Sequence, residues 1–134
     1  MNRDPKTPAA SAIVSARAPR PLGPYPHARR LGNLLFLSGI GPRHRVTEQI
    51  PEGIEAQTRA CIENVKAILE DAGSALEKVV DVTVFLTNMK DDFAIYNKIY
   101  AEQFAENRPC RTTVEINALP TPIAIELKVI ATID

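Results

Sequence analysis

The amino-acid sequence predicts an α+β fold, in which two helices cover one face of a mixed sheet of six strands. Three short strands, a helix, a strand, a second helix and two strands follow one another along the chain. The 134 residues, of which 45% are hydrophobic, suffice for a packed core without disulfides or metal. The two cysteines, Cys61 and Cys110, lie far apart and belong to no metal-binding motif. We therefore expect a single domain at residues 12–134, after a flexible tail at residues 1–11.

The N-terminal part of this domain is expected to contain three strands. Residues 13–18 form the first strand, and the segment PRPLGPYP follows as a rigid loop because proline restricts the backbone. Residues 27–31 and 34–38 flank the pair Gly32 and Asn33, which is typical of a two-residue hairpin turn. These two strands should therefore pair with each other.

The central part is expected to alternate between helix and strand. Residues 54–72 carry apolar side chains at steps of three and four, which indicates an amphipathic helix that Gly73 ends. Residues 79–87 are apolar on both faces of a strand. Asn88 is a typical helix N-cap, and the second helix after it repeats apolar and aromatic residues at a spacing that indicates core packing: Phe93, Tyr96, Ile99, Tyr100 and Phe104.

Two further strands, at residues 110–119 and 123–133, complete the predicted sheet. Because two helices cover only one face of a sheet, apolar residues on the other face need another cover. The strand at 79–87 and Ile130 place such residues there. We expect sister subunits to cover this face in a closed ring.

Charge and targeting signals narrow the classes of function. Sixteen Lys and Arg residues balance 16 Asp and Glu residues, so the attraction that nucleic acids or membrane surfaces require is missing. No apolar run approaches the ~20 residues that cross a bilayer, and the N-terminal residues lack the apolar core of an export signal. We expect a cytoplasmic protein that binds neither nucleic acid nor membrane.

Arg111 and Glu126 are the pair of residues most suited to chemistry. On its strand Arg111 lies opposite Val114, and Glu126 lies opposite Leu127, so both side chains are expected to point away from the helix-covered core. They could be ordinary solvated strand residues or a structural ion pair. If subunits bury this face, the two groups instead lie in a partly desolvated cleft that suits a small molecule.

Several segments together resemble the YjgF/RidA family. The run GPYPHARRLGNLLFLSGIGP is similar to the opening of that family, and the similarity continues through IEAQTRACIENVKAILEDAG, RPCRTTVEINALP and IAIELKVIA. It covers the chain from about residue 21 to residue 133. The resemblance implies a chorismate-mutase-like α+β fold and a homotrimeric barrel with active sites in three clefts between subunits. It also implies hydrolysis of enamines and imines derived from amino acids, without metal or cofactor.

The resemblance also assigns roles to individual residues. It implies that Arg111 binds the substrate carboxylate and that Glu126 positions and activates water. The other substrate-binding positions that it implies are Tyr25, Ser38, Gly39, Asn97 and Thr113, the last replacing a cysteine of the family. A planar guanidinium holds a carboxylate through two hydrogen bonds, and a carboxylate is a suitable general base.

The segment after Gly39 departs from the family pattern, because Arg43, His44 and Arg45 are adjacent there. They could be a solvated charge cluster, or Arg43 and His44 could bind the second carboxylate of a dicarboxylic substrate. Within the family the sequence resembles most the 2-aminomuconate deaminases. The implied reaction converts the dicarboxylic enamine 2-aminomuconate and water into 4-oxalocrotonate (2-oxohex-3-enedioate) and ammonia, as part of the degradation of aminophenol or 3-hydroxyanthranilate.

Three alternatives stay open. The first is a general 2-iminobutanoate/2-iminopropanoate deaminase with the same chemistry. The second is a ribonuclease, which the neutral charge disfavours. The third is a non-enzymatic ligand-binding or chaperone-like protein that uses the same clefts. His27 and His44 lack further ligands at metal-site spacing and are expected at the surface or in a cleft, whereas Cys110 is expected to be a buried packing residue.

Overall fold

The computed structural model describes residues 11–134, so most of the predicted tail lies outside the described residues. Along the chain the elements are β1 (Ser11–Ile13), β2 (Ala28–Leu31), β3 (Leu34–Leu37), α1 (Ile54–Asp71), the 3₁₀ turn η1 (Leu76–Lys78), β4 (Val79–Leu86), α2 (Met89–Gln103), β5 (Cys110–Glu115) and β6 (Ile125–Thr132).

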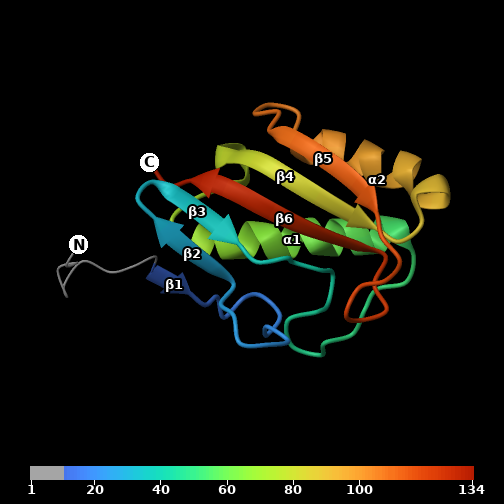
Figure 1. The fold of residues 1–134 in the computed structure, drawn as a ribbon, viewed down its shortest axis with the longest axis horizontal. Coiled ribbons are helices and arrows are strands. Elements are labelled where there is room, and N and C mark those ends of the chain that lie inside the picture. Colours follow the sequence, from blue (N-terminus) through green and yellow to red (C-terminus); the bar gives the residue numbers. More distant parts are fainter. Residues whose placement is uncertain (1–10) are drawn as a thin grey trace.

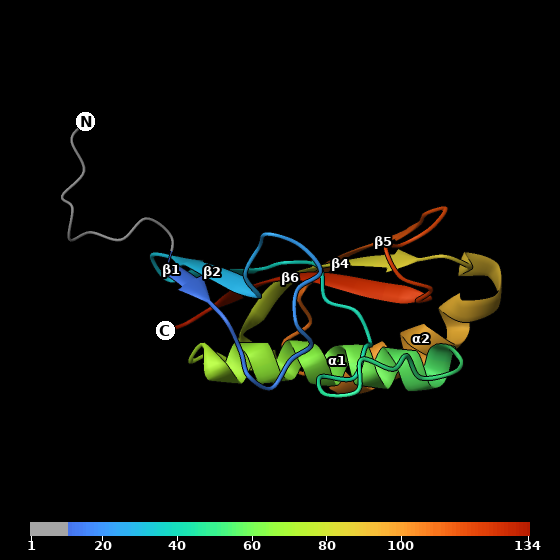
Figure 2. The ribbon, with the colours of Figure 1, turned by 90° about the horizontal axis from the view of Figure 1, so that it is seen from below.

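The six strands form one sheet in the order β1-β2-β3-β6-β4-β5 (Figure 1). Only β4 and β5 run parallel, and every other neighbouring pair is antiparallel. Both helices lie on the same side of this sheet (Figure 2). The prediction of an α+β fold with two helices on one face of a mixed six-stranded sheet is therefore confirmed.

The core lies between the helices and the covered face of the sheet. The largest fully buried side chains come from α1, α2 and the strands: Tyr96, Leu35, Leu37, Ile68, Leu69, Leu86, Ile125, Leu127, Val65, Val82, Val84 and Val129. Full burial of one such aliphatic side chain stabilises the fold by about 1.5–3 kcal/mol. Burial of alternate residues on β4 and β6 therefore determines which side chains of these strands point to the other face.

The first strand differs from the prediction, because it spans Ser11–Ile13 instead of residues 13–18. The chain leaves the sheet at Ser15, whose hydroxyl donates to a carboxylate oxygen of Asp71 at 2.5 Å at the end of α1. Arg17 also pairs with Asp71, at 2.8 Å. These long-range contacts tie the segment to α1. Similarly, β5 ends at Glu115, so residues 116–119 do not continue the predicted strand.

His27 is buried and therefore not a surface residue, but it lines a cavity, in agreement with the alternative expectation of a cleft residue. Its Nδ1 accepts a hydrogen bond from the backbone N–H of Ser15 at 2.9 Å, and its Nε2 lies 2.6 Å from the carbonyl oxygen of Pro19. Nδ1 is thus the acceptor, which makes Nε2–H the donor to Pro19. The imidazole therefore links the start of the domain to the proline-rich loop.

The helix-free face of the sheet carries a mixture of apolar and charged side chains. Phe36 pairs with Ile130, and Phe85 pairs with both Val114 and Glu126. These apolar side chains are only partly buried, because neither α1 nor α2 covers this face (Figure 2). Within residues 11–134, no helix has the length and apolar character to cross a membrane.

Candidate active site

Glu126 projects from the helix-free face of β6. Its neighbours Ile125 and Leu127 are both buried in the core, so alternation turns the carboxylate to the opposite face. The side chain is half-buried, and within the described residues no hydrogen bond or ion pair reaches it. Burial raises the pKa of Glu126 above its ordinary value of 4.5. A carboxylate in this environment is a stronger base than one in free solution.

Gly39 provides the space that the Glu126 carboxylate occupies. A Cβ atom at position 39 would lie 2.8 Å from Cδ of Glu126 and would overlap the carboxylate oxygen. The adjacent Ile40 forms an antiparallel β-bridge with Leu127. The N–H of each residue donates to the carbonyl of the other, at 2.8 and 2.9 Å. The end of β3 is therefore held directly beside β6, and glycine at position 39 allows that close approach.

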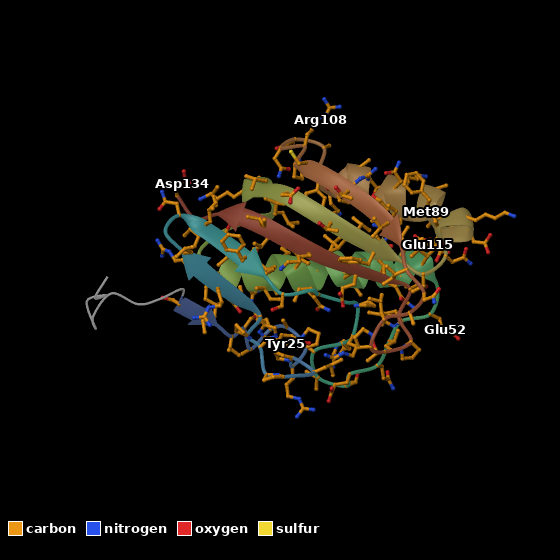
Figure 3. The ribbon with its side chains drawn as sticks, in the orientation of Figure 1. Tyr25, Glu52, Met89, Arg108, Glu115 and Asp134 are labelled. Carbon is orange, nitrogen blue, oxygen red and sulfur yellow. The ribbon has the colours of Figure 1, made fainter. Side chains whose placement is uncertain are left out.

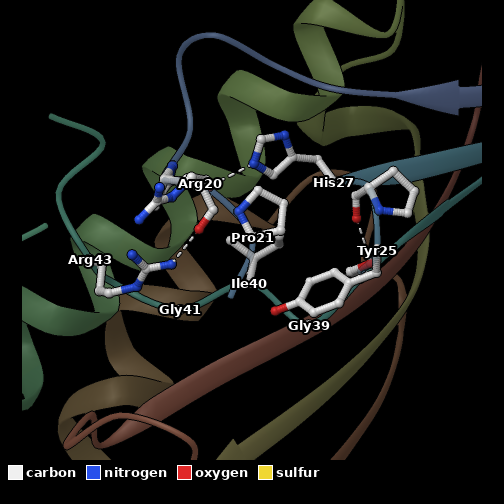
Figure 4. A pocket seen from close by; sticks show the side chains of 11 residues that line it. Arg20, Pro21, Tyr25, His27, Gly39, Ile40, Gly41 and Arg43 are labelled. Atoms are coloured by element: carbon white, nitrogen blue, oxygen red, sulfur yellow. Dashed lines mark hydrogen bonds between the residues drawn. The ribbon is translucent and has the colours of Figure 1, made fainter. Parts of the chain in front are cut away.

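Tyr25, Gly39, Arg43 and Glu126 line one small cavity of about 50 Å³. That volume holds a few water molecules next to the carboxylate. Ser38 lines an adjoining cavity with Tyr25, Gly39 and Arg43, and its hydroxyl donates to the carbonyl of Pro26 at 2.8 Å. Figure 4 shows that Tyr25, Gly39, Gly41 and Arg43 surround this adjoining cavity. Four of the expected site residues thus gather with Glu126.

Arg43 and His44 separate from each other, although they are neighbours in sequence. The Arg43 side chain is 13% exposed, and its guanidinium pairs with Glu48 at 2.9 Å and donates to the carbonyl of Arg20 at 2.7 Å (Figure 4). His44 accepts hydrogen bonds through Nδ1 from the backbone N–H groups of Val46 and Thr47. It lines another cavity, of about 350 Å³, between its loop and α1, which Arg43 also borders. The structure therefore brings Arg43, but not His44, to Glu126.

The predicted direction of the Arg111 side chain is wrong, because the side chain points to the helices and not away from them. It pairs with Val82, which is fully buried under the helices, so Arg111 lies on the helix-covered face of the edge strand β5. Its guanidinium donates to Oδ1 of Asn97 on α2 at 2.7 Å. The sequence correctly predicted which residues of β5 share a face. The apolar half, which includes Val114, faces the helix-free side, where Val114 pairs with Phe85.

Thr113 also points to α2. It pairs with buried Val84, and its hydroxyl lies 3.1 Å from the hydroxyl of Tyr96. Burial raises the pKa of Tyr96, although the contact with Thr113 counteracts this effect. Arg111, Asn97 and Thr113 therefore form a second group of expected site residues, between β5 and α2.

Within one chain the two groups of residues lie on opposite faces of the sheet. Glu126 of β6 pairs with Phe85, and Arg111 of β5 pairs with Val82, three residues earlier on the strand β4 between them. An odd separation places the side chains on different faces. A single chain therefore does not bring Arg111 and Glu126 into one cavity.

Sequence reasoning missed two features of the second group. Phe93, Tyr96 and Tyr100 were expected only to pack in the core, but the Arg111 guanidinium lies over all three rings. Their spacing along α2, together with an arginine on the next strand, could have indicated this contact. Cys110 is exposed and not a buried packing residue, because it begins the edge strand β5.

Metal ligands do not gather in the part of the chain that the structure describes. No three His, Cys, Asp or Glu residues of 11–134 are placed to hold one ion.

Figure 3 shows the described side chains over the whole fold, with Tyr25 on the lower loops and Glu115 at the end of β5.

Comparison with known proteins adds family information to this geometry. A RutC family protein of Pyrococcus abyssi is 44% identical over 124 residues, which is 92% of this chain and 97% of that protein. TdcF of Escherichia coli, named as a proposed reactive intermediate deaminase, is 37% identical over 122 residues, or 89% of this chain and 94% of TdcF.

Solved structures share the whole fold. TdcF of Escherichia coli with bound serine matches with a TM-score of 0.86 and 36% identity, covering 91% of this chain and 98% of that one. Yeast Mmf1 matches with a TM-score of 0.89 and 30% identity, over 94% and 100% of the two chains. The family model described as Endoribonuclease L-PSP matches residues 15–133. The chain therefore belongs to this family, which is the YjgF/RidA family that its sequence motifs resemble.

Proposed function

We propose that the protein is a hydrolytic deaminase of enamines and imines. The observation that carries this proposal is the half-buried Glu126 carboxylate, which has a raised pKa, no partner in residues 11–134 and a cavity of about 50 Å³ beside it. Such a group is suited to accept a proton from water. The likeness to a relative with bound serine supports a small ligand that carries a carboxylate.

The proposed reaction adds water across a C=N bond. Arg111 holds the carboxylate next to the imine carbon, which a planar guanidinium does through two parallel hydrogen bonds. Glu126 removes a proton from water as the oxygen attacks that carbon, giving a carbinolamine. The protonated Glu126 then returns the proton to the nitrogen, and the C–N bond breaks as the carbinolamine hydroxyl gives its own proton to the Glu126 carboxylate and becomes the carbonyl. The products are a 2-oxo acid and ammonia.

The proposed site lies between subunits, because a single chain places Glu126 and Arg111 on opposite faces of its sheet. A neighbouring subunit that covers the helix-free face would bring the Arg111 edge of β5 towards the Glu126 cavity. The partly exposed apolar residues of that face support such a cover. We propose a homotrimer in which a closed ring repeats this contact three times. A cytoplasmic location belongs to the same proposal.

Mixing two inactive variants tests the shared site. Subunits with Glu126→Gln and subunits with Arg111→Ala, refolded together in equal amounts, should recover about a quarter of wild-type activity, because random assembly in a ring reunites one intact Glu126 with one intact Arg111 at that frequency. Ammonia release measures the recovery, and light scattering measures the mass of the assembly. A mixture as inactive as its components, or a stable monomer, would contradict the shared site.

Two substrate classes fit the proposal. Small 2-imino acids such as 2-iminobutanoate and 2-iminopropanoate need only one carboxylate contact. They are favoured by the ion pair between Arg43 and Glu48, because this pair reduces the capacity of Arg43 to bind a second carboxylate. The dicarboxylic enamine 2-aminomuconate, which would give 4-oxalocrotonate, is favoured by the position of Arg43 in the Glu126 cavity.

Freshly generated substrates separate the two classes. Decay of 2-aminomuconate absorbance with equal ammonia release, at a kcat/KM well above that for 2-iminobutanoate, would identify the dicarboxylic substrate. The reverse order would identify the small acids. Absence of ammonia from every substrate would refute the deaminase and leave a ligand-binding protein or a ribonuclease.

The activity should depend on pH through Glu126. Only the ionised carboxylate accepts a proton from water, and burial raises its pKa above 4.5. We expect kcat/KM to fall as the pH is lowered through this raised pKa, so the acid limb should lie at a higher pH than that of a solvated glutamate. Initial rates between pH 4 and pH 8 measure the limb, on substrates whose own titration is known. A midpoint at or below 4.5 would contradict the role of the buried carboxylate.

Replacement of Gly39 by Ala should lower kcat about 10- to 100-fold, because the added Cβ displaces the Glu126 carboxylate, and small misplacements of a catalytic group have effects of this size. Gly41→Ala is the matched control. A Cβ there meets the Cδ1 methyl of Ile123 at 2.8 Å and not the carboxylate. Equal kcat losses in both variants would show that general disturbance of the loop, rather than Glu126, explains the effect.

A further inference from the structure

The Arg111 guanidinium lies against three aromatic side chains of α2. Its Cζ atom is 4.8 Å from the ring centroid of Tyr100, 5.6 Å from that of Tyr96 and 5.9 Å from that of Phe93. We infer that these three rings are positioning residues, which form an aromatic cradle that orients Arg111 for the substrate carboxylate. This inference rests on the proposed function and adds to it the residues that determine how its carboxylate is bound.

The cradle is a continuous row of rings along α2. Phe93 and Tyr96 pack edge to face with centroids 5.8 Å apart, and Tyr96 and Tyr100 do the same at 5.9 Å. The row continues to Phe104, whose centroid is 4.6 Å from that of Tyr100. Steps of three and four residues place these rings on one side of the helix. The cradle is thus part of the packed core and has little freedom to move.

The partners of Arg111 are all electrically neutral. It contacts the three rings and the side-chain amide of Asn97, and within residues 11–134 no carboxylate forms an ion pair with it. Four other arginines of the described chain differ, because they pair with Glu or Asp: Arg17, Arg20, Arg43 and Arg59. The positive charge of an arginine with no acidic partner is not balanced by the protein, so it can bind a ligand anion.

The contacts of Arg111 also determine which donors remain for the ligand. The ring faces attract the cation, and Asn97 accepts a hydrogen bond from one N–H at 2.7 Å. A guanidinium has five N–H groups in a planar fork, so the remaining edge can present two parallel donors. A planar carboxylate fits this edge. We therefore expect selection for imines that carry a carboxylate beside the C=N carbon and rejection of the matching amides or esters.

Substitution of Tyr100 by Leu tests the cradle, because it removes the nearest ring but retains an apolar side chain. KM for a 2-imino acid should rise about tenfold with a much smaller change in kcat, a size that fits loss of one cation–π contact. Tyr100→Phe keeps the ring and removes a buried hydroxyl that has no hydrogen-bond partner within residues 11–134, so it should retain the wild-type KM. Phe104→Leu is the matched control, because it shortens the same row without touching Arg111.

A second measurement needs no turnover. The Nε–H proton of Arg111 in the ligand-free protein should show an upfield ring-current shift and slow rotation of the guanidinium in NMR spectra. Both signs should be weakened in Tyr100→Leu, which removes the nearest ring, and kept at the wild-type size in Tyr100→Phe and Phe104→Leu. If the shift is absent from the wild type, or if Phe104→Leu raises KM as much as Tyr100→Leu, the cradle is refuted. Wild-type protein that shows the NMR signs but releases no ammonia would refute the deaminase and not the cradle.

Discussion

Replacement of Glu126 by Gln should lower kcat by about 10³-fold, since loss of a general base typically reduces a rate by 10²- to 10⁴-fold. The amide has nearly the same shape as the carboxylate but does not accept a proton from water. KM should change little, because Arg111 provides the carboxylate contact in the proposed site. Steady-state ammonia release with wild type and variant measures the effect.

The same substitution should stabilise the fold at neutral pH. Burial raises the pKa of Glu126 in the folded state, so the stability that its protonated form provides is present below its unfolded pKa and is lost as the pH rises through the folded pKa. A neutral amide avoids that loss. Glu63→Gln is the control and should leave both activity and stability unchanged, because Glu63 is an exposed residue of α1 that lines the His44 cavity and not the Glu126 cavity. A Glu126→Gln protein with more than a tenth of wild-type kcat would exclude Glu126 as the base.

Replacement of Arg111 by Lys should lower kcat/KM by at least about 10²-fold, although the charge is kept. Lysine lacks the planar fork that makes two parallel hydrogen bonds, and loss of charge-assisted hydrogen bonds has an effect of this size. Most of the loss should appear in KM. Substrate titration with the small 2-imino acid separates the two constants.

Arg59→Lys is the matched control for this substitution. Arg59 lies on the outer side of α1, where it pairs with Glu55 and Glu102 at 3.6 Å, and exposed pairs of this kind contribute little. Its replacement should leave kcat/KM within about twofold. If Arg111→Lys behaves like Arg59→Lys, another cation must bind the carboxylate.

Local sequence patterns predicted most of the fold. The three- and four-residue apolar steps of α1 and the Asn88 cap, which accepts from the N–H of Asp91, indicated both helices within a residue or two of their observed ends. The first strand was misplaced because its end depends on contacts far away in sequence. Ser15 bonds to Asp71, 56 residues later, and no local pattern contains that information.

The candidate site was predictable in composition and not in geometry. Family motifs named Arg111 and Glu126, and alternation divided each strand correctly into two faces. The error concerned which face of β5 the helices cover. An apolar residue such as Val114 normally indicates the core, but here it lies on the helix-free face, next to Phe85. The neighbouring strand β4 is apolar on both faces, so the sequence alone does not show which of its faces the apolar half of β5 joins.

The backbone bridge between Ile40 and Leu127 has a consequence for the evolution of substrate range. Main-chain hydrogen bonds hold the β6 backbone around Glu126, through Ile40 on one side and through β4 on the other. The position of the Glu126 carboxylate therefore does not depend on the following loop, residues 41–53. Insertions, deletions or exchanges in that loop can remodel the wall of the cavity while the reacting group stays in place, so new specificities can arise there without loss of the underlying chemistry.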